Sequence, residues 1–131
     1  MVTIARDLVR ELLANAAGGR GGALIGPAGT TEIRALATAG GERDFGAGDL
    51  GEAGLREVAG KAGVKNPLQI GCWRPAVGGP AKPEAREFPA GKPGFLVLVV
   101  AVRGGSAAEW AFWRLDPVTV QPVPETVHII P

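Results

Sequence analysis

The sequence predicts a single α/β domain whose mixed, mostly antiparallel sheet is sandwiched by helices. Two segments repeat apolar residues at helical spacing, and several short apolar runs bounded by glycine or proline are typical of strands. The expected helices are inserted between strands that mostly return as hairpins, which indicates a mixed sandwich. A length of 131 residues fits one domain. We therefore expect one unit over residues 1–131, with a proline-rich tail from about residue 116.

The N-terminal part predicts a helix followed by a hairpin. Thr3 can cap the helix, in which apolar residues recur at helical spacing: Ile4, Leu8, Val9, Leu12 and Leu13. Asn15 and the glycines at 18–19 end it. Strands at Gly22–Gly26 and Thr31–Ala39 flank a turn at 27–29, which indicates a hairpin. Alternation in the second strand allows one shared face for three residues: Ile33, Ala35 and Ala37.

A second helix is predicted after a loop at Gly40–Gly48. Asp49 and Glu52 form the acidic version of a capping box at its start. Gly63 is a good C-terminal stop. The helix between them places four apolar residues on one face: Leu55, Val58, Ala59 and Ala62.

The C-terminal half predicts strands around one long loop. Pro67–Trp73 is expected to be a strand, and Arg74–Pro93 an irregular loop that holds a helical turn at Pro83–Phe88. Gly94–Val102 is the most apolar segment, as expected of a central strand covered on both faces. The remaining expected segments are a hairpin partner at Ala107–Leu115, a proline-broken connection at Asp116–Pro124, and a short strand or extended tail at Thr126–Ile130.

The composition excludes many enzymes. The chain has one histidine, His128, one cysteine, Cys72, and no tyrosine. Zinc sites mostly need three or four ligands from these residue types, and a Ser-His-Asp triad would have to use His128. The formal net charge is +1 and no basic stripe emerges, so we expect no nucleic-acid partner.

The sequence also predicts no membrane association. The longest uncharged apolar run, Gly94–Val102, is far too short to span a bilayer. Asp7 and Glu11 interrupt the first apolar stretch, which is therefore not a signal peptide. A single cysteine and no export signal fit a reducing compartment, so we expect a cytoplasmic protein.

One stretch, Ile70–Phe88 with the sequence IGCWRPAVGGPAKPEAREF, resembles the JAMM (MPN) metalloprotease domain, whose members include deubiquitinating isopeptidases. In that family a strand ends in Gly-aromatic-His-Ser-His-Pro, and Pro-Ser-x-x-Asp opens a short helix after a loop. The two histidines and the aspartate bind zinc, and an upstream glutamate acts as general base. The order of the predicted elements is similar over nearly the whole chain. The resemblance implies a JAMM/MPN-like fold with cytidine-deaminase-like architecture.

The chemical positions of this family are replaced in the present chain. Gly22–Gly26 matches a Gly-Leu-Leu-Gly strand of the family, and the position of the glutamate falls near Gly19, where there is no carboxylate. Pro75 matches the proline of the histidine motif, and Pro83 that of Pro-Ser-x-x-Asp. This alignment sets Cys72, Trp73 and Arg74 against His-Ser-His, Glu84 against the serine and Glu87 against the aspartate.

The resemblance therefore implies a catalytically inactive domain that holds no metal or cofactor. Metal-free members of the family act as scaffolds, so we expect a protein-interaction module with a protein partner or a homodimer. The alternative is a small-molecule-binding domain that uses the vacated cleft. Its candidate residues are Cys72, Trp73, Arg74, Glu84 and Glu87.

Three further candidate sites have simpler interpretations. A zinc site at Cys72, Glu87 and His128 is disfavoured, because Arg74 would set a fixed cation beside the metal. A nucleophilic pair of Cys72 and His128 is disfavoured because a lone cysteine in a strand is usually a small hydrophobe. Cations on the long loop are interspersed with Glu84 and Glu87, which favours a solvated mixed-charge loop: Arg74, Lys82, Arg86 and Lys92.

An aromatic group near the C-terminus is the best candidate for a partner surface. It comprises Trp110, Phe112 and Trp113. Side chains alternate along a strand, so the two tryptophans are expected to point to opposite faces. One should belong to the core. The other should be exposed, and so available as an interface anchor, unless a helix, the tail or another subunit covers it.

Overall fold

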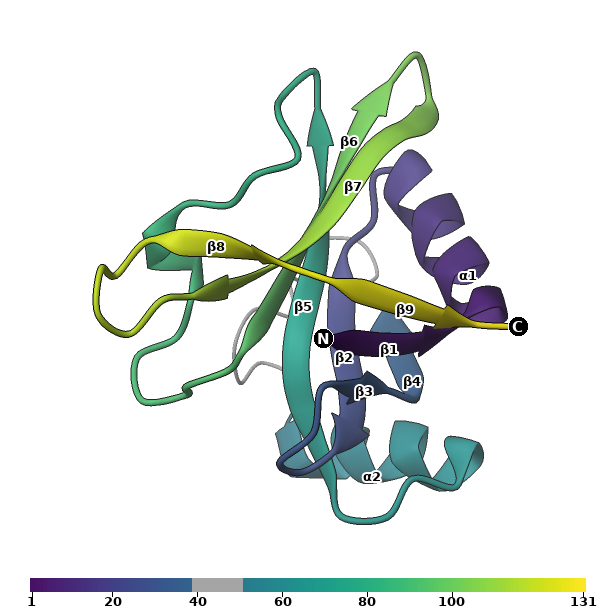
Figure 1. The fold of residues 1–131 in the computed structure, drawn as a ribbon. Helices are drawn as coiled ribbons and strands as arrows, with labels where there is room; N and C mark the ends of the chain where they lie inside the picture. Colours follow the sequence, from purple (N-terminus) through teal and green to yellow (C-terminus); the bar gives the residue numbers. More distant parts are fainter. Residues whose placement is uncertain (39–50) are drawn as a thin grey trace.

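The computed structural model describes residues 1–38 and 51–131. The expected loop at Gly40–Gly48 and the cap at Asp49 lie outside the described residues. The described part holds a six-stranded sheet in the order β4-β2-β5-β6-β7-β8 and a three-stranded sheet in the order β3-β1-β9 (Figure 1). A mixed α/β fold is thereby confirmed. The larger sheet is mostly antiparallel as expected, since β5 and β6 are its one parallel pair within these residues.

The bounds of the elements are as follows. The larger sheet contains β4 (Ala35–Thr38), β2 (Gly22–Pro27), β5 (Pro67–Val77), β6 (Leu96–Arg103), β7 (Ser106–Leu115) and β8 (Pro122–Glu125). The smaller sheet contains β3 (Glu32–Ile33), β1 (Val2–Ala5) and β9 (Val127–Ile130). The helices are α1 (Arg6–Ala17), α2 (Gly51–Ala62) and the 3-10 turn η1 (Ala85–Glu87). Among the described residues, no helix is long and apolar enough to cross a membrane.

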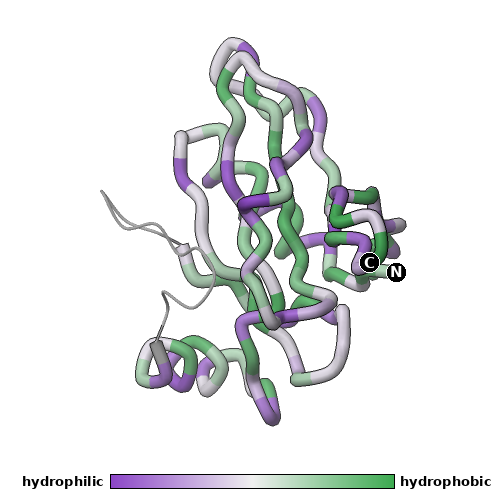
Figure 2. Tube along the Cα trace, turned by 90° about the vertical axis from the view of Figure 1, so that its left-hand side faces the viewer, coloured by the Kyte–Doolittle hydropathy of each residue, from purple (hydrophilic) through white to green (hydrophobic). Residues whose placement is uncertain are grey.

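The larger sheet is covered on both faces. One face packs against α1 and the smaller sheet, in a core that includes Leu12, Leu24 and Phe112. The other face packs against α2 through alanines of β2 and β4, and against Phe88 and Phe95 farther along the sheet. Figure 2 shows hydrophobic residues running along the central strands. β6 lies between β5 and β7 and is buried from its first residue to Val102, which confirms the expected central strand.

The start of the chain differs from the expectation. Val2–Ala5 is a strand, and α1 begins only at Arg6, so Thr3 does not cap it. The β-branched residues of β1 pair in parallel with β3 on one side and β9 on the other, and Val2 and Ile4 are fully buried. Pairing with both neighbours outweighs the helical spacing of the apolar residues. In Figure 1 the strands at the two ends of the chain, β1 and β9, consequently lie side by side.

The predicted hairpin forms, but its second strand divides between the two sheets. β2 and β4 pair antiparallel, while β3 joins β1 in the smaller sheet. The shared face expected for Ile33, Ala35 and Ala37 is therefore wrong. Ile33 packs in the core beneath α1, whereas the two alanines face α2. In α2, Leu55, Val58 and Ala59 pack toward the sheet as expected, but Ala62 is exposed.

β5 is longer than expected, because it continues through Pro75 to Val77. The first four residues of the expected loop Arg74–Pro93 are therefore strand. β5 pairs with β2 only as far as Trp73, while its pairing with β6 continues to Val77. Beyond Trp73 the strand has one described neighbour, and a proline is tolerated at such an open edge. The later expectation of a helical turn at Pro83–Phe88 is confirmed by η1.

The end of the chain adds two strands. The expected connection Asp116–Pro124 is a turn followed by β8, which pairs antiparallel with β7 at the edge of the larger sheet. Its prolines suit an edge strand, because a proline cannot donate to a second neighbour. The expected strand at Thr126–Ile130 is confirmed as β9.

Candidate functional site

The candidate residues on β5 point to opposite faces of the sheet. Trp73 is 2% exposed and packs in the core beneath α1. Its indole Nε1 donates a hydrogen bond to the carbonyl oxygen of Arg20 at 3.2 Å. Cys72 packs on the other face, toward Phe88 and Phe95. The side chain of Trp73 is therefore part of the core and does not border one cleft with Cys72 and Arg74.

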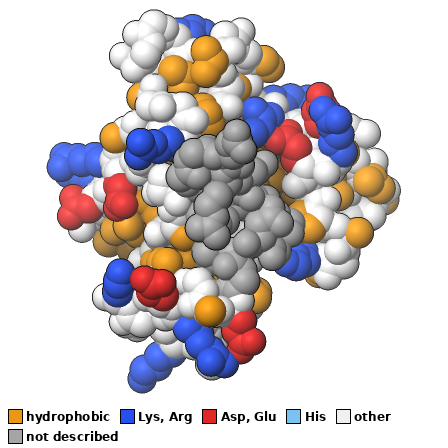
Figure 3. Space-filling model, turned by 180° about the vertical axis from the view of Figure 1, so that it is seen from behind, with side chains coloured by type: hydrophobic (Ala, Val, Ile, Leu, Met, Phe, Trp, Pro, Cys, Tyr) orange, Lys and Arg blue, Asp and Glu red, His pale blue; other side chains and the backbone are white. Residues whose placement is uncertain are grey.

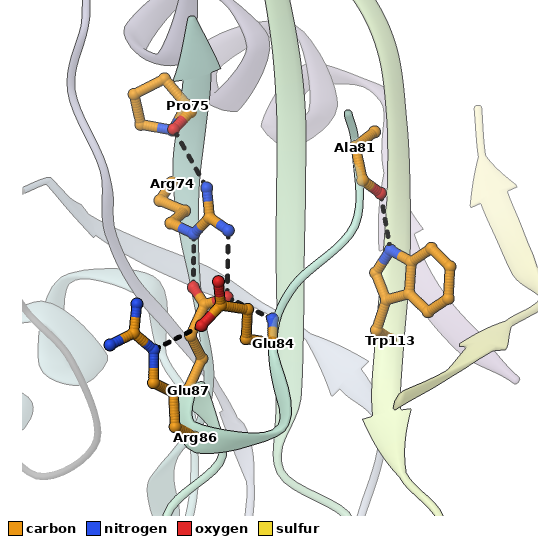
Figure 4. Close-up of polar contacts among 7 residues, drawn as sticks. All are labelled: Arg74, Pro75, Ala81, Glu84, Arg86, Glu87 and Trp113. Carbon is orange, nitrogen blue, oxygen red and sulfur yellow. Dashed lines mark hydrogen bonds and ion pairs between the residues drawn. The ribbon is translucent and has the colours of Figure 1, made fainter. Parts of the chain in front are cut away.

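Arg74 and Glu87 form a two-pronged ion pair (Figure 4). The guanidinium Nε donates to one carboxylate oxygen of Glu87, and Nη2 donates to the other at 3.0 Å. Paired hydrogen bonds of this geometry are the strong form of an arginine–carboxylate contact. The structure thus joins two candidates that are thirteen residues apart in the sequence.

The turn η1 holds Glu87 in place for this contact. The amide of Glu84 donates to the second carboxylate oxygen of Glu87 at 2.6 Å, and the amide of Glu87 donates back to the carbonyl oxygen of Glu84 at 3.0 Å. An acidic residue at the third position of a helical turn commonly closes back on the start of that turn. The carboxylate therefore receives donors from the turn and from Arg74 together.

These contacts shift both titrations. The hydrogen bond with Glu87 raises the pKa of Arg74 above its ordinary value and outweighs the lowering effect of burial. Charge interactions with Glu87 and with the nearby Cys72 raise this pKa further. Burial alone would raise the pKa of Glu87. The hydrogen bonds from Arg74 and from the Glu84 amide, together with the charges of Arg74 and Arg86, outweigh that effect and lower the pKa of Glu87. At neutral pH Arg74 is therefore positively charged and Glu87 negatively charged.

The lowered pKa of Glu87 predicts a loss of stability in acid. Stability from this pair is fully present above the ordinary glutamate pKa and is lost as pH falls through the lowered value. We expect about 1 kcal/mol, because Arg74 is 38% exposed and solvent screens the pair. Urea unfolding at pH 7 and pH 3 would measure it.

Asp116 also has a lowered pKa, through hydrogen bonds from the Val118 amide and the Thr119 hydroxyl, so the wild type alone does not isolate Glu87. The pH dependence of Glu87→Gln is expected to be smaller by about that 1 kcal/mol. Glu84→Gln is the matched control, and an equal reduction in both variants would contradict the assignment.

The other loop cations mostly have partners among the described residues. Arg86 forms an ion pair with Glu84 at 2.5 Å, and the Lys82 ammonium lies 6.0 Å from the ring centre of Trp113. On the face of the molecule seen in Figure 3, basic and acidic side chains are likewise interspersed. These contacts fit the interpretation of a mixed-charge loop.

The aromatic candidates are largely covered by the chain itself. Trp110 and Trp113 do point to opposite faces, since they pack in different cores. Phe112 is 1% exposed and meets Trp110 edge to face, so within the chain its side chain belongs to the core. The indole of Trp113 donates to the carbonyl oxygen of Ala81 at 2.9 Å. Neither tryptophan is fully exposed, and the loop supplies the cover of Trp113.

The structure does not bring Cys72 and His128 together. Cys72 packs on the face of the sheet that carries Phe88 and Phe95, whereas His128 is exposed on β9, whose sheet covers the opposite face. Within residues 1–38 and 51–131, no three His, Cys, Asp or Glu side chains gather as a metal site would require.

The glycine-rich run after α1 has a role that the sequence alone did not reveal. A Cβ on Gly21 would lie 2.5 Å from the Trp73 carbonyl oxygen, and one on Gly22 would lie 2.3 Å from the Trp73 ring. Only glycine allows this segment to approach β5 so closely. The signal for this close approach in the sequence is the run of glycines directly before the predicted strand Gly22–Gly26.

Comparison with known proteins gives the fold and nothing further. No family model matches the chain, and no curated protein matches it. A solution structure of a protein from Salinibacter ruber has a TM-score of 0.68 at 22% identity, over 99% of this chain and 92% of that one. A solution structure of a protein from Desulfitobacterium hafniense has a TM-score of 0.67 at 14% identity, over 99% and 93%. The mixed α/β fold described above is thus shared with these two proteins.

Proposed function

We propose that the chain is a catalytically inactive, metal-free JAMM/MPN-like domain that acts through protein contacts as an interaction or scaffold module. The observation that carries the proposal is the ion pair of Arg74 and Glu87. By the resemblance, Arg74 stands at the second histidine and Glu87 at the aspartate. Two positions that would have to meet at a zinc ion are therefore in direct contact.

A third position of the family lies close to the same strand. The resemblance puts the missing glutamate near Gly19, and the neighbouring Arg20 accepts the indole hydrogen bond of Trp73. Gly21 packs directly on the backbone of β5 at Trp73 and Arg74. The segment after α1 therefore lies beside β5 next to Arg74, although the hydrogen bond of the Trp73 indole is on the opposite face of the sheet from the Arg74–Glu87 pair. This adjacency in the backbone supports a JAMM/MPN-like framework.

The same contact supports the absence of metal chemistry. A guanidinium is a fixed cation and has no lone pair to offer a metal. Both carboxylate oxygens of Glu87 already accept hydrogen bonds from Arg74 or Glu84. A divalent ion would have to displace these contacts and would then lie beside a positive charge.

The pairing also weakens the alternative of a small-molecule site in the vacated cleft. That alternative uses Arg74 as the charge partner of an anionic ligand, but Glu87 already occupies the guanidinium. Trp73, another candidate residue of this cleft, has its side chain in the core. The protein's own side chains thus supply the contacts that a ligand would make.

Metal analysis tests the proposal. We expect well below one zinc per chain, about 0.1 or less, in protein purified through a peptide tag without chelators, because the ligand set of a zinc site is missing. Inductively coupled plasma mass spectrometry would measure the content. Stoichiometric zinc would overturn the inactive interpretation.

Tagged protein isolated from the native host tests the second part of the proposal, that the domain acts through protein contacts. An interaction module should co-purify with a protein partner in near-stoichiometric amount or sediment as a homodimer. A monomer that retains no partner after mild crosslinking in the cell would contradict that half.

A further inference from the structure

A hollow of about 400 Å³ lies at the N-terminal ends of β5 and β6, away from the Arg74–Glu87 pair. Its walls come from the turn after β2, the start of β5 and the loop before β6. The lining is Gly29, Thr30, Thr31, Leu68, Gln69, Ile70 and the segment 91–95. The volume falls within the range of roughly 300–1,000 Å³ typical of small-molecule sites. The hollow is therefore large enough for a small organic ligand.

The two walls are held by backbone hydrogen bonds. In the first, the amide of Ala28 donates to the carbonyl oxygen of Asn66 at 2.8 Å, which ties the turn after β2 to the start of β5. In the second, the amide of Phe95 donates to the carbonyl oxygen of Lys92 at 3.2 Å. Pro93 and Gly94, the latter with φ of 81°, fill the central positions typical of a type II turn. Both walls are thus formed without a ligand.

The floor of the hollow depends on an irregularity in β5. Leu24 pairs with Gly71 and Ile25 with Gln69, so Ile70 is an extra residue in the ladder. Such a bulge re-aims side chains, and it lets three consecutive residues of β5 line one hollow. Ile70 packs mainly in the core beneath α1 and Phe95 in the core on the other face, and each contributes a small exposed part of its side chain to the hollow, while Leu68 is 48% exposed at the rim.

Lys92 gives the hollow its charge. It is the one charged side chain among the residues that line the hollow. Within the described ranges, 1–38 and 51–131, it takes part in no ion pair. Lys92 is the first residue of the turn that the Phe95–Lys92 hydrogen bond closes, and this bond fixes the Lys92 backbone at the opening of the hollow. An apolar floor beneath a lone cation complements an apolar molecule that carries one negative charge.

We propose that this hollow binds a small amphiphilic monoanion, such as a medium-chain carboxylate. The hydrocarbon body lies on Leu68, Ile70 and Phe95, and the carboxylate pairs with the Lys92 ammonium. The site is independent of the proposed scaffold function, because it shares no residue with the Arg74–Glu87 pair.

Nitrogen–proton NMR titration with octanoate tests the site on the intact chain. We expect saturable shifts confined to 29–31, 68–70 and 91–95. Lys92→Gln should weaken binding about fivefold, as expected for one partly exposed ion pair. Lys82→Gln is the matched control and should bind as the wild type does. Leu68→Glu, which sets a carboxylate at an exposed rim position, should abolish saturation without unfolding the chain.

Two further probes identify the chemistry of the ligand. Octanol and octylamine share the hydrocarbon chain of octanoate but are neutral and cationic. If either binds as tightly as octanoate, the assignment to anions is overturned. Shifts that spread over the molecule without saturation, or that are unchanged in Leu68→Glu, would overturn the site itself.

Discussion

Replacing Trp73 with alanine is expected to lower the free energy of unfolding by roughly 3 to 5 kcal/mol. The side chain is among the largest that are fully buried, and it packs with the core beneath α1. Truncation would leave a large cavity next to Gly22, whose backbone lies against the ring. It would also remove the donor to the Arg20 carbonyl oxygen. Urea denaturation followed by circular dichroism would measure the change.

Trp113→Ala is the matched control for this prediction. Trp113 also donates its indole hydrogen to a loop carbonyl, that of Ala81, but it is only partly buried. We expect a cost of about 2 kcal/mol or less there, because less apolar surface leaves water. Equal costs at the two positions would contradict the assignment of Trp73 to the core. Trp73→Phe should be intermediate, since it keeps most of the packing and loses the hydrogen bond.

Local patterns predicted much of the fold. The uninterrupted apolar run of β6 and the glycine turn before β7 are strong local signals, and both elements form as expected. The errors arose where distant segments decide the structure. Val2–Ala5 is a strand because β9, from the other end of the chain, pairs with it. Pro75 stays in β5 because β2, whose first residue pairs with Trp73, does not extend as far as Pro75. A pattern within a short window contains neither fact.

The sequence predicts only part of the candidate site, because the contacts between its residues also depend on distant segments. The resemblance to the family motif predicts that Arg74 and Glu87 belong to one site, and the structure brings them into contact. Trp73 is adjacent to Arg74 in the motif, but alternation along a strand sets its side chain on the opposite face. The hollow beside Lys92 has walls from three separate segments and depends on a bulge. Periodicity in the sequence does not reveal such a site.

Installing histidines at two positions on β5 is expected to create a zinc site. Cys72 and Arg74 are two residues apart on a strand, so their side chains share a face, and Arg74 already reaches Glu87. Cys72→His with Arg74→His would present two imidazoles and a carboxylate, the set found in many catalytic zinc sites. Loss of one residue that hydrogen-bonds to a metal ligand weakens zinc binding about 10- to 100-fold. Two added ligands should have a larger effect, so we expect the double variant to bind zinc more than about a hundredfold tighter than the wild type. Calorimetric titration at pH 7.5 would measure it.

The controls separate a framework effect from adventitious binding. Each single variant should bind zinc more weakly than the double variant, because two ligands hold the ion less well than three. Adding Glu87→Gln to the double variant should weaken it again, since an amide is a poorer zinc ligand than a carboxylate. Binding should also fall below about pH 6.5, where imidazoles become protonated. A double variant that retains the native circular dichroism spectrum but takes up no zinc would contradict the JAMM/MPN-like framework. If it does bind zinc, then the lack of histidine at these two positions is what separates the present chain from a metal-binding domain.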